Sequence, residues 1–357
     1  MTKIYNVAVI GAGSGGKLSM KGAAASERFN LVAVADWRAE ARREAEGLYT
    51  GLRTFATHQE LFATVSVDVV CVSTWPPTHL AVTQDALALP IQGILVEKPL
   101  ADNTADGRTL LDAVRTKGLP MVTPHGLLVA EHVQQIMTRV RGGEIGELKL
   151  IEIQCSGWDI INAGIHWLNF VVVLTNQAPV DFVLATCDAS TRTYRDGMQV
   201  ETTAVTYIQL QSGLRVVMNT GDYVKSSEPG ESILFRLVGT QGTLDFYAWK
   251  SRYRLCNAEF PQGQLIEVDP GPRSAHQKYL ELLADQIDKQ APDYTWPAAS
   301  LAALALCEAA YLSNQQRAVV SLPLTDFTAP PPTDWAPGKP YNGQGGGRDG
   351  RRLPPQT

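Results

Sequence analysis

A glycine-rich turn near the start of the chain constrains the fold more than any other feature of the sequence. The turn Gly11-Ala12-Gly13-Ser14-Gly15-Gly16 follows the apolar run at residues 4–10, and its first, third and sixth residues fit the pattern G-x-G-x-x-G. The first glycine of that pattern permits a tight turn, the second lets the backbone approach a pyrophosphate, and the third lets a helix pack closely on the strand. Between a strand and a helix, this turn predicts a binding site for a dinucleotide.

The residues after the turn alternate between short apolar runs and amphipathic helical patterns. The apolar runs lie at residues 4–10, 31–35, 67–73, 94–96 and 121–122, and the helical patterns lie at residues 38–47, 78–89 and 104–117. Alternating strands and helices predict a parallel sheet covered on both faces, and strands buried on both faces need not alternate polar with apolar residues. We therefore expect residues 1–122 to form a doubly wound α/β domain of the Rossmann type.

The pattern changes after residue 123, where strands become more frequent than helices. Strand patterns lie at residues 147–155, 181–187, 202–211, 214–219, 233–238 and 265–268, with a hairpin turn at residues 211–213, and helical patterns lie at residues 130–141, 276–289 and 297–315. We expect residues 123–328 to form an α/β domain around one large, mostly antiparallel sheet. The Pro/Gly-rich tail at residues 329–357 cannot form a core, so we expect it to be disordered or to lie as an arm over a partner subunit.

Composition excludes several classes of protein. Hydrophobic residues make up 45% of the 357 residues and charged residues 19%, a balance typical of a globular protein. The net charge of −5 and the lack of a basic cluster argue against a nucleic-acid partner, and no apolar run is long enough to predict a membrane span. The chain starts without an apolar leader, so we expect a cytoplasmic protein. The five dispersed cysteines indicate neither disulfides nor a metal site.

Asp36 is positioned to select between two coenzymes. It lies 20 residues after Gly16, at the end of the second predicted strand. A carboxylate there would accept hydrogen bonds from the adenosine ribose and repel a 2′-phosphate, which favours NAD over NADP. We place Trp37 and Arg38 at the same site. Two alternatives remain: Arg38 could pair with a 2′-phosphate, and Asp36 could merely cap the next helix.

Lys98 is the first predicted catalytic residue. Glu97-Lys98-Pro99 follows the apolar run at residues 94–96, and ligands of open parallel sheets collect at the carboxyl ends of strands. We expect Lys98 to face the nicotinamide, where it would bind a substrate hydroxyl and take part in proton transfer. A cis peptide bond before Pro99 would fix the direction of the lysine. The alternative is an ordinary surface lysine after an edge strand.

These and later motifs resemble the glucose–fructose oxidoreductase / inositol dehydrogenase / MocA (Gfo/Idh/MocA) family. The matching segments are Gly11 to Gly16, Asp36, Ser73-Thr74-Trp75-Pro76-Pro77-Thr78-His79, Glu97-Lys98-Pro99-Leu100, Gly142-Gly143-Glu144-Ile145-Gly146-Glu147, Gly164-Ile165-His166 and Val238-Gly239-Thr240-Gln241-Gly242-Thr243-Leu244. The resemblance implies a Rossmann domain, and a second domain whose open sheet makes a homodimer or homotetramer interface. It also implies NAD(P)-dependent redox chemistry on a sugar, a cyclitol or a related carbinol.

The same resemblance identifies His166 as the second catalytic residue. Dehydrogenases of the family often carry D-x-G-x-H-x-x-D, and the histidine of that motif matches His166, whereas Asn162 and Asn169 replace the two aspartates. An asparagine can hydrogen-bond a hydroxyl, but it cannot take a proton or stabilise an imidazolium by charge. We therefore expect His166 to be the general base, assisted by Lys98, with Asn162 lining the substrate pocket.

Other residues are placed near the site by their position in the sequence. We expect cofactor contacts from Ser73, Thr74, Trp75, His79 and Glu97 and substrate contacts from His125, Trp158, Asp159 and Asn162, with Tyr223 and Arg252 as further pocket residues. Trp75 could instead be a core aromatic residue, and His79 could be a structural hydrogen bonder. Asp159 is the nearby carboxylate that could compensate for Asn162.

The sequence thus predicts an NAD-dependent oxidoreductase that moves hydride between nicotinamide and a hydroxyl-bearing carbon of a sugar, sugar derivative or cyclitol. Two alternatives share the fold. The first is glycoside cleavage by transient oxidation, elimination, hydration and re-reduction, with NAD recycled. The second is a regulator that responds to NAD without catalysis, against which the retention of Lys98 and His166 argues.

Overall fold

In the computed structural model, residues 3–188, 195–198, 200–226, 228 and 230–324 are described. These residues form two compact units, one of residues 3–126 and 273–301 and the other of the remainder. The sequence places residues 273–301 in the second domain, whereas the structure joins them to the first unit. The reason is that α8 (Ala275–Lys289) packs against α1 (Ser14–Ala24) and against two strands of the first sheet. The expected tail at residues 329–357 lies outside the described residues.

The first unit is built on a six-stranded parallel sheet of order β3-β2-β1-β4-β5-β6, as the sequence predicts. The strands are β1 (Tyr5–Ile10), β2 (Phe29–Ala35), β3 (Arg53–Phe55), β4 (Val69–Val72), β5 (Gly93–Val96) and β6 (Met121–Val122). The helices between them are α1, α2 (Ala39–Leu48), α3 (His58–Thr64), α4 (His79–Leu87) and α5 (Thr104–Thr116). The three-residue strand β3 and the short helix α3 were not predicted, because neither is long enough to give a clear periodicity.

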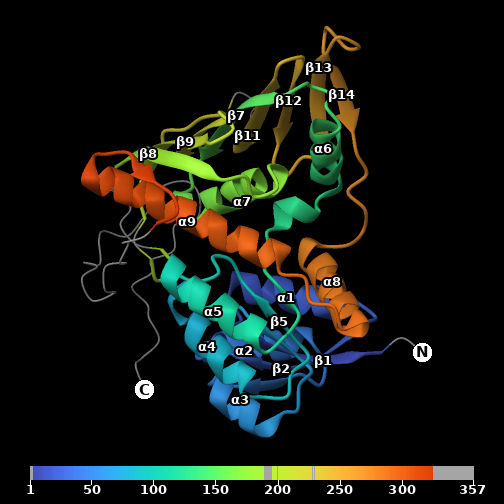
Figure 1. The fold of residues 1–357 in the computed structure, drawn as a ribbon. Helices are drawn as coiled ribbons and strands as arrows, with labels where there is room; N and C mark the ends of the chain where they lie inside the picture. The colour runs from blue at the N-terminus through green and yellow to red at the C-terminus, as the bar shows by residue number, and fades with distance from the viewer. Residues whose placement is uncertain (1–2, 189–194, 199, 227, 229, 325–357) are drawn as a thin grey trace. The chain divides into compact units, whose positions relative to one another are not determined.

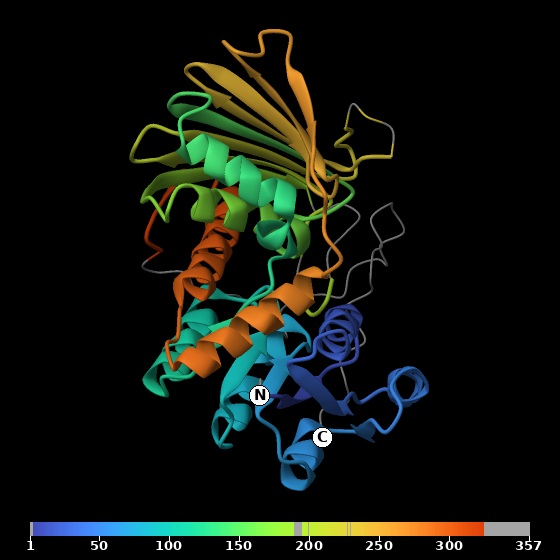
Figure 2. The same ribbon diagram turned by 90° about the vertical axis from the view of Figure 1, so that its right-hand side faces the viewer.

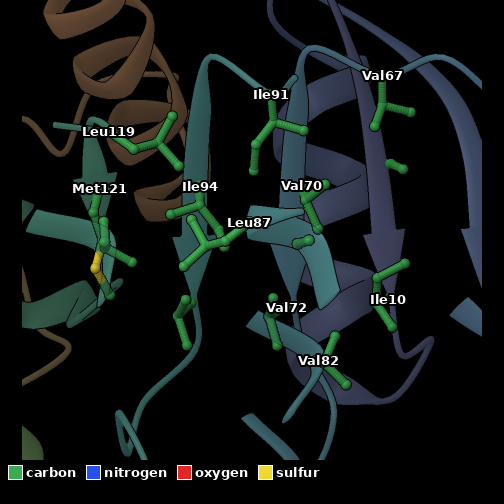
Figure 3. Packing of buried hydrophobic residues seen from close by; sticks show 14 of the residues in the cluster. Ile10, Val67, Val70, Val72, Val82, Leu87, Ile91, Ile94, Leu119 and Met121 are labelled. Carbon is green, nitrogen blue, oxygen red and sulfur yellow. The ribbon is translucent and has the colours of Figure 1, made fainter. Parts of the chain in front are cut away.

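The core of the first unit lies between its sheet and the covering helices. Ile10, Val70, Val72 and Ile94 come from the strands, and all are at most 2% exposed (Figure 3). Val82 of α4 packs against them from the helical layer. Because this sheet is apolar on both faces, its chemistry is confined to the ends of the strands.

The second unit contains a nine-stranded sheet of order β14-β13-β12-β11-β7-β10-β9-β8-β15. Its strands are β7 (Leu148–Ser156), β8 (Val180–Asp188), β9 (Thr203–Leu210), β10 (Arg215–Gly221), β11 (Ile233–Gly239), β12 (Gly242–Tyr247), β13 (Arg252–Asn257), β14 (Gln264–Glu267) and β15 (Val320–Ser321). Among these described strands β7 and β10 pair in parallel, and the other pairs are antiparallel. The mostly antiparallel sheet is therefore confirmed. The strands β12, β13 and β15 were not predicted.

One face of this sheet is covered by helices. Figure 2 shows α6 (Glu131–Arg141) and α7 (Ile165–Leu174) against that face. The long helix α9 (Thr295–Gln316), which is labelled in Figure 1, begins in the first unit and ends in the second. Along β9 the buried residues Ala204, Thr206 and Ile208 alternate with more exposed ones, as expected for a sheet covered on one side. No helix in the described ranges is long and apolar enough to cross a membrane.

Candidate functional site

The glycine turn joins β1 to α1 and leaves little room for any other residue. Gly11 has φ of +93°, and a Cβ on it would lie 2.5 Å from the carbonyl oxygen of Ser73. A Cβ on Gly16 would lie 1.8 Å from the carbonyl oxygen of Gly11. The backbone after β4 leaves no space for a side chain on Gly11, and the backbone of the turn leaves none on Gly16 at the start of α1. Both positions therefore require glycine.

Gly13 differs from these two glycines because its side faces open space. No atom lies within 4 Å of a Cβ built there, and Gly13 is the N-cap of α1, which it cannot cap with a side chain. The backbone N–H groups of the first helical turn make a helix N-terminus an anion site. This turn, the open space beside it and the carboxylate at the end of β2 fit the pyrophosphate and ribose of a dinucleotide.

Asp36 is bound by its neighbours on both carboxylate oxygens. Oδ2 accepts from the backbone N–H of Ala12 at 2.8 Å, and Oδ1 accepts from the backbone N–H of Arg38 at 2.8 Å. The Arg38 guanidinium pairs with the same carboxylate at 2.9 Å. Burial raises the pKa of Asp36, but the hydrogen bonds from Arg38 and Ala12 more than offset it, so the pKa lies below its usual value. The N-cap of α2 is Arg38, so Asp36 does not cap that helix.

Lys98 lies two residues after the end of β5, at the carboxyl end of the sheet, and the Lys98–Pro99 peptide bond is cis, the form that the sequence left open. Lys98 is half-buried, and its backbone N–H donates to Glu97 Oε2 at 3.3 Å. The other oxygen of Glu97 contacts His276 Nε2 at 2.6 Å. Sequence patterns do not reveal this contact, since His276 lies 179 residues away on α8.

The segment from Ser73 to His79 follows β4 and lies beside the glycine turn. His79 is fully buried, and its ring nitrogens face the carbonyl oxygens of Pro99 at 3.0 Å and Thr74 at 3.0 Å. This arrangement gives His79 the structural role that the sequence left open, because the ring joins this segment to the backbone after Lys98. Trp75 is half-buried at the start of a 3-10 turn.

His125 is buried in the first unit. Its side chain is 1% exposed, and Nε2 hydrogen-bonds Ser300 Oγ at 2.8 Å. Burial and, second, the charge of Lys98 lower the pKa of His125 to about 3, so the ring is neutral at physiological pH. Its contact with a substrate stays a prediction.

The second unit carries Asp159, Asn162 and His166. Asp159 caps the π-helical turn Ile160–Gly164, and its Oδ1 accepts from the backbone N–H of Asn162 at 2.7 Å and from Asn162 Nδ2 at 3.0 Å. Asp159 is fully buried and Asn162 is 6% exposed, whereas His166, in the first turn of α7, is half-buried. The carboxylate of Asp159 therefore sets the direction of the Asn162 amide.

A buried cluster of charged groups surrounds Asp159, and the sequence did not reveal it. Arg195 pairs with Asp159 at 3.1 Å and lies over the ring of Trp158 at 4.5 Å. Glu201 accepts from the backbone N–H of Ile160 at 2.7 Å. Burial and then the negative charge of Asp159 raise the pKa of Glu201 to about 7. Both carboxyl groups thus hold the backbone that leads to His166.

The remaining predicted residues differ in how exposed they are. Trp37 is 45% exposed and Tyr223 is 73% exposed. Arg252 pairs with Glu228 at 2.6 Å. Asn169, which replaces the second aspartate of the family motif, is fully buried within α7. In the described ranges no group of three or more His, Cys, Asp or Glu side chains could hold a metal ion.

Two family models match the chain, one in each half. Residues 5–125 match the oxidoreductase family with an NAD-binding Rossmann fold, and residues 156–322 match the C-terminal alpha/beta domain of the same family. Both models describe Gfo/Idh/MocA proteins. The first match includes the glycine turn, Asp36 and Lys98, and the second includes Asp159, Asn162 and His166.

Individual relatives are distant in sequence but similar along almost their whole length. The rhizopine catabolism protein MocA of Rhizobium meliloti is 24% identical over 323 residues, which cover 86% of this chain and 94% of that protein. An aldose-aldose oxidoreductase from Caulobacter crescentus, solved with glycerol, has a TM-score of 0.76 at 20% identity and covers 90% of this chain and 100% of its own. A 3-ketoreductase from Actinomadura kijaniata, solved with TDP-benzene and NADP, has a TM-score of 0.74 at 16% identity, with coverage of 87% and 98%.

Proposed function

Because the chain belongs to the Gfo/Idh/MocA family of oxidoreductases, we propose that it oxidises or reduces a hydroxyl-bearing carbon of a sugar, sugar derivative or cyclitol with NAD. The observation that carries this proposal is the place of Lys98, two residues after the end of β5 at the carboxyl end of the first sheet, where the His79 ring contacts the carbonyl oxygen of Pro99. When bound, the nicotinamide supplies the hydride donor or acceptor. The protein supplies the groups that bind and deprotonate the hydroxyl.

Lys98 and His166 have different roles in the proposal. The Lys98 ammonium binds the reacting oxygen and stabilises the charge that develops on it. His166 takes the hydroxyl proton at a ring nitrogen during oxidation and returns it during reduction. Asn162, which Asp159 orients, hydrogen-bonds another hydroxyl of the substrate. An amide cannot exchange the proton itself, so the transfer is assigned to His166.

NAD is proposed over NADP because of Asp36. Its ionised carboxylate lies at the end of β2 and would repel a 2′-phosphate. Three hydrogen bonds hold Arg38 against that carboxylate, so the carboxylate partly neutralises the positive charge of Arg38. A protein of similar fold has been solved with NADP, so the preference for NAD over NADP is to be measured with both coenzymes.

The test is a panel of sugars and cyclitols with NAD⁺ or NADP⁺, followed by absorbance of the reduced coenzyme. Lys98→Ala and His166→Ala should lower kcat/KM by at least about 100-fold, the usual loss on removing a general base or a group that stabilises charge. Matched controls are Lys149→Ala and His58→Ala, which remove surface ion pairs. Turnover by both active-site variants at the rates of these controls would refute the assignment. Glycoside cleavage without net NADH would support the redox-recycling alternative instead.

We further propose that one face of the nine-stranded sheet, which none of the described helices covers, joins two copies of the chain. Leu184 on β8 and Val205 on β9 are 44% and 48% exposed on that face, beside the stacked rings of Phe182 and Tyr207. Exposed apolar residues grouped on one sheet face mark an interaction surface. Val205→Glu should lower the mass measured by light scattering from that of a dimer or tetramer, and an unchanged mass would contradict the proposal.

A further inference from the structure

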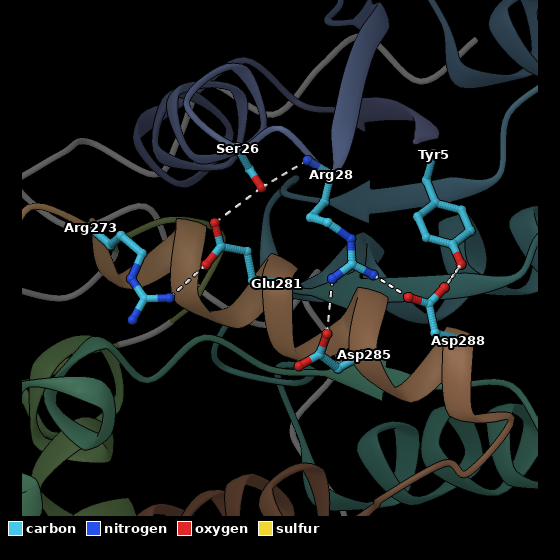
Figure 4. A network of polar contacts seen from close by, with 7 residues as sticks. All are labelled: Tyr5, Ser26, Arg28, Arg273, Glu281, Asp285 and Asp288. Atoms are coloured by element: carbon cyan, nitrogen blue, oxygen red, sulfur yellow. Dashed lines mark hydrogen bonds and ion pairs between the residues drawn. The ribbon is translucent and has the colours of Figure 1, made fainter. Parts of the chain in front are cut away.

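Helix α8 is tied to the first unit by polar contacts at the amino ends of β1 and β2 (Figure 4). Arg28, the residue before β2, donates to Asp285 at 2.9 Å and to Asp288 at 2.5 Å. The hydroxyl of Tyr5 on β1 donates to the same Asp288. These contacts fix the C-terminal half of α8 against β1 and β2.

The first turn of α8 is fixed against α1. Ser274 caps α8 by accepting from the backbone N–H of Gln277 at 3.2 Å, and Gln277 Nε2 donates to the carbonyl oxygen of Ala25 at 3.3 Å. Gly22 lets the two helices approach, because a Cβ there would lie 2.8 Å from the backbone nitrogen of Gln277. His276 lies in this turn, so these contacts fix the position of its backbone.

That ring contacts the carboxylate that lies next to the glycine turn. His276 Nε2 is 2.6 Å from Glu97 Oε1, and both residues are less than 8% exposed. On its other side Glu97 packs against the start of α1, because a Cβ on Gly15 would lie 3.0 Å from Cδ of Glu97. Since an ionised carboxylate can only accept, the ring N–H is the donor.

Glu97 is ionised although it is buried. Burial raises its pKa, but the charge and hydrogen bond of His276, followed by the charges of Lys98 and His79, bring the pKa below its usual value. A buried anion therefore lies against the helix turn that fits a pyrophosphate. A carboxylate that rotated toward this turn would compete for the same N–H groups and would repel the phosphates.

We propose that His276 is a positioning residue for coenzyme binding: its Nε2–H holds the Glu97 carboxylate away from the phosphate site and on the backbone N–H of Lys98. The inference rests on the proposed dinucleotide binding and extends it to α8, which follows β14 in the sequence. His276 touches neither the reacting atoms nor the phosphates in this proposal. It acts through Glu97.

The experiment is a fluorescence titration of the full-length protein with NADH, without any substrate. His276→Ala should raise the Kd by about 10- to 100-fold, because the released Glu97 carboxylate would compete for the N–H groups of the turn and repel the phosphates. His276→Gln keeps a donor at a similar reach and should bind within about 3-fold of the wild type. The double variant Glu97→Gln/His276→Ala carries no charge at this point and should regain most of the affinity. His58→Ala, which breaks a surface pair with Asp85, is the matched control.

The outcomes separate positioning from simple loss of structure. Circular dichroism and the Tm establish folding, and a purely structural role would leave the double variant as weak as His276→Ala, which would overturn the proposal. Wild-type affinity in His276→Ala would also overturn it, as would His276→Gln binding as weakly as His276→Ala. A wild-type protein that binds no NADH or NADPH would instead overturn the proposed function, so the two failures are distinguishable.

Discussion

Replacing Glu201 with glutamine should change how the stability of the protein depends on pH. Glu201 is 2% exposed, and burial together with the charge of Asp159 raises its pKa from 4.5 to about 7. Below pH 4.5 the folded and unfolded chains both hold the proton. Between that pH and about 7 the unfolded chain loses its proton while the folded chain keeps it, so the free energy of unfolding falls as the pH rises.

The magnitude follows from these two pKa values. Each pKa unit corresponds to about 1.4 kcal/mol, so ionisation of Glu201 removes about 2 to 3 kcal/mol of stability between pH 5 and pH 8. A glutamine has no proton to lose and can still accept from the backbone N–H of Ile160. For a unit of this size, Glu201→Gln should gain about 5 to 10 °C in Tm relative to the wild type as the pH rises over that range.

Calorimetry at several pH values tests this expectation. The relevant quantity is the difference in Tm between variant and wild type at each pH, since the other titrating groups cancel in it. Glu40→Gln, on a side chain that is 82% exposed, is the control and should give a difference that does not vary with pH. If the difference for Glu201→Gln is equally constant, then Glu201 titrates normally and the electrostatic reasoning is refuted.

Three further predictions concern the turn, the buried charges and the choice of coenzyme. Gly16→Ala should abolish measurable NADH binding in a fluorescence titration, since its Cβ would lie 1.8 Å from the carbonyl oxygen of Gly11; binding at wild-type affinity would contradict it. Asp159→Ala leaves Arg195 buried without its 3.1 Å partner and should cost about 3–5 kcal/mol in denaturant unfolding, whereas a loss below about 1 kcal/mol would show that the pair is dispensable. Asp36→Ala releases the arginine two residues on and should raise the ratio of kcat/KM for NADP⁺ to that for NAD⁺ by at least about 10-fold; an unchanged ratio would remove the basis for preferring NAD.

The fold class could be predicted because its signals are local. Four apolar runs in the first unit became β1, β2, β4 and β5 within a few residues of the expected bounds, and β6 matched at both ends. The hairpin of β12 and β13 was missed because charged residues such as Asp245 and Arg254 alternate along it on the uncovered face. A strand with one solvated face gives a weaker apolar signal than a buried strand.

The candidate site was predictable where a residue's role depends on the adjacent backbone. Lys98 follows β5, and its peptide bond to Pro99 is cis, as proline at that position suggested. The partners of the site were not predictable. Nothing in the sequence near residue 97 indicates His276, and nothing near Asp159 indicates Arg195 or Glu201.

The Rossmann domain and its dinucleotide turn follow from local sequence, because the conformational freedom of glycine and the period of a strand or helix are properties of consecutive residues. The tertiary structure alone decided that α8 completes the first unit and that Glu97 faces His276. It also decided that two carboxyl groups share the buried space before α7. The physical reason is the same in each case: burial and hydrogen bonding depend on which distant segments pack together, and a buried charge takes its properties from those neighbours.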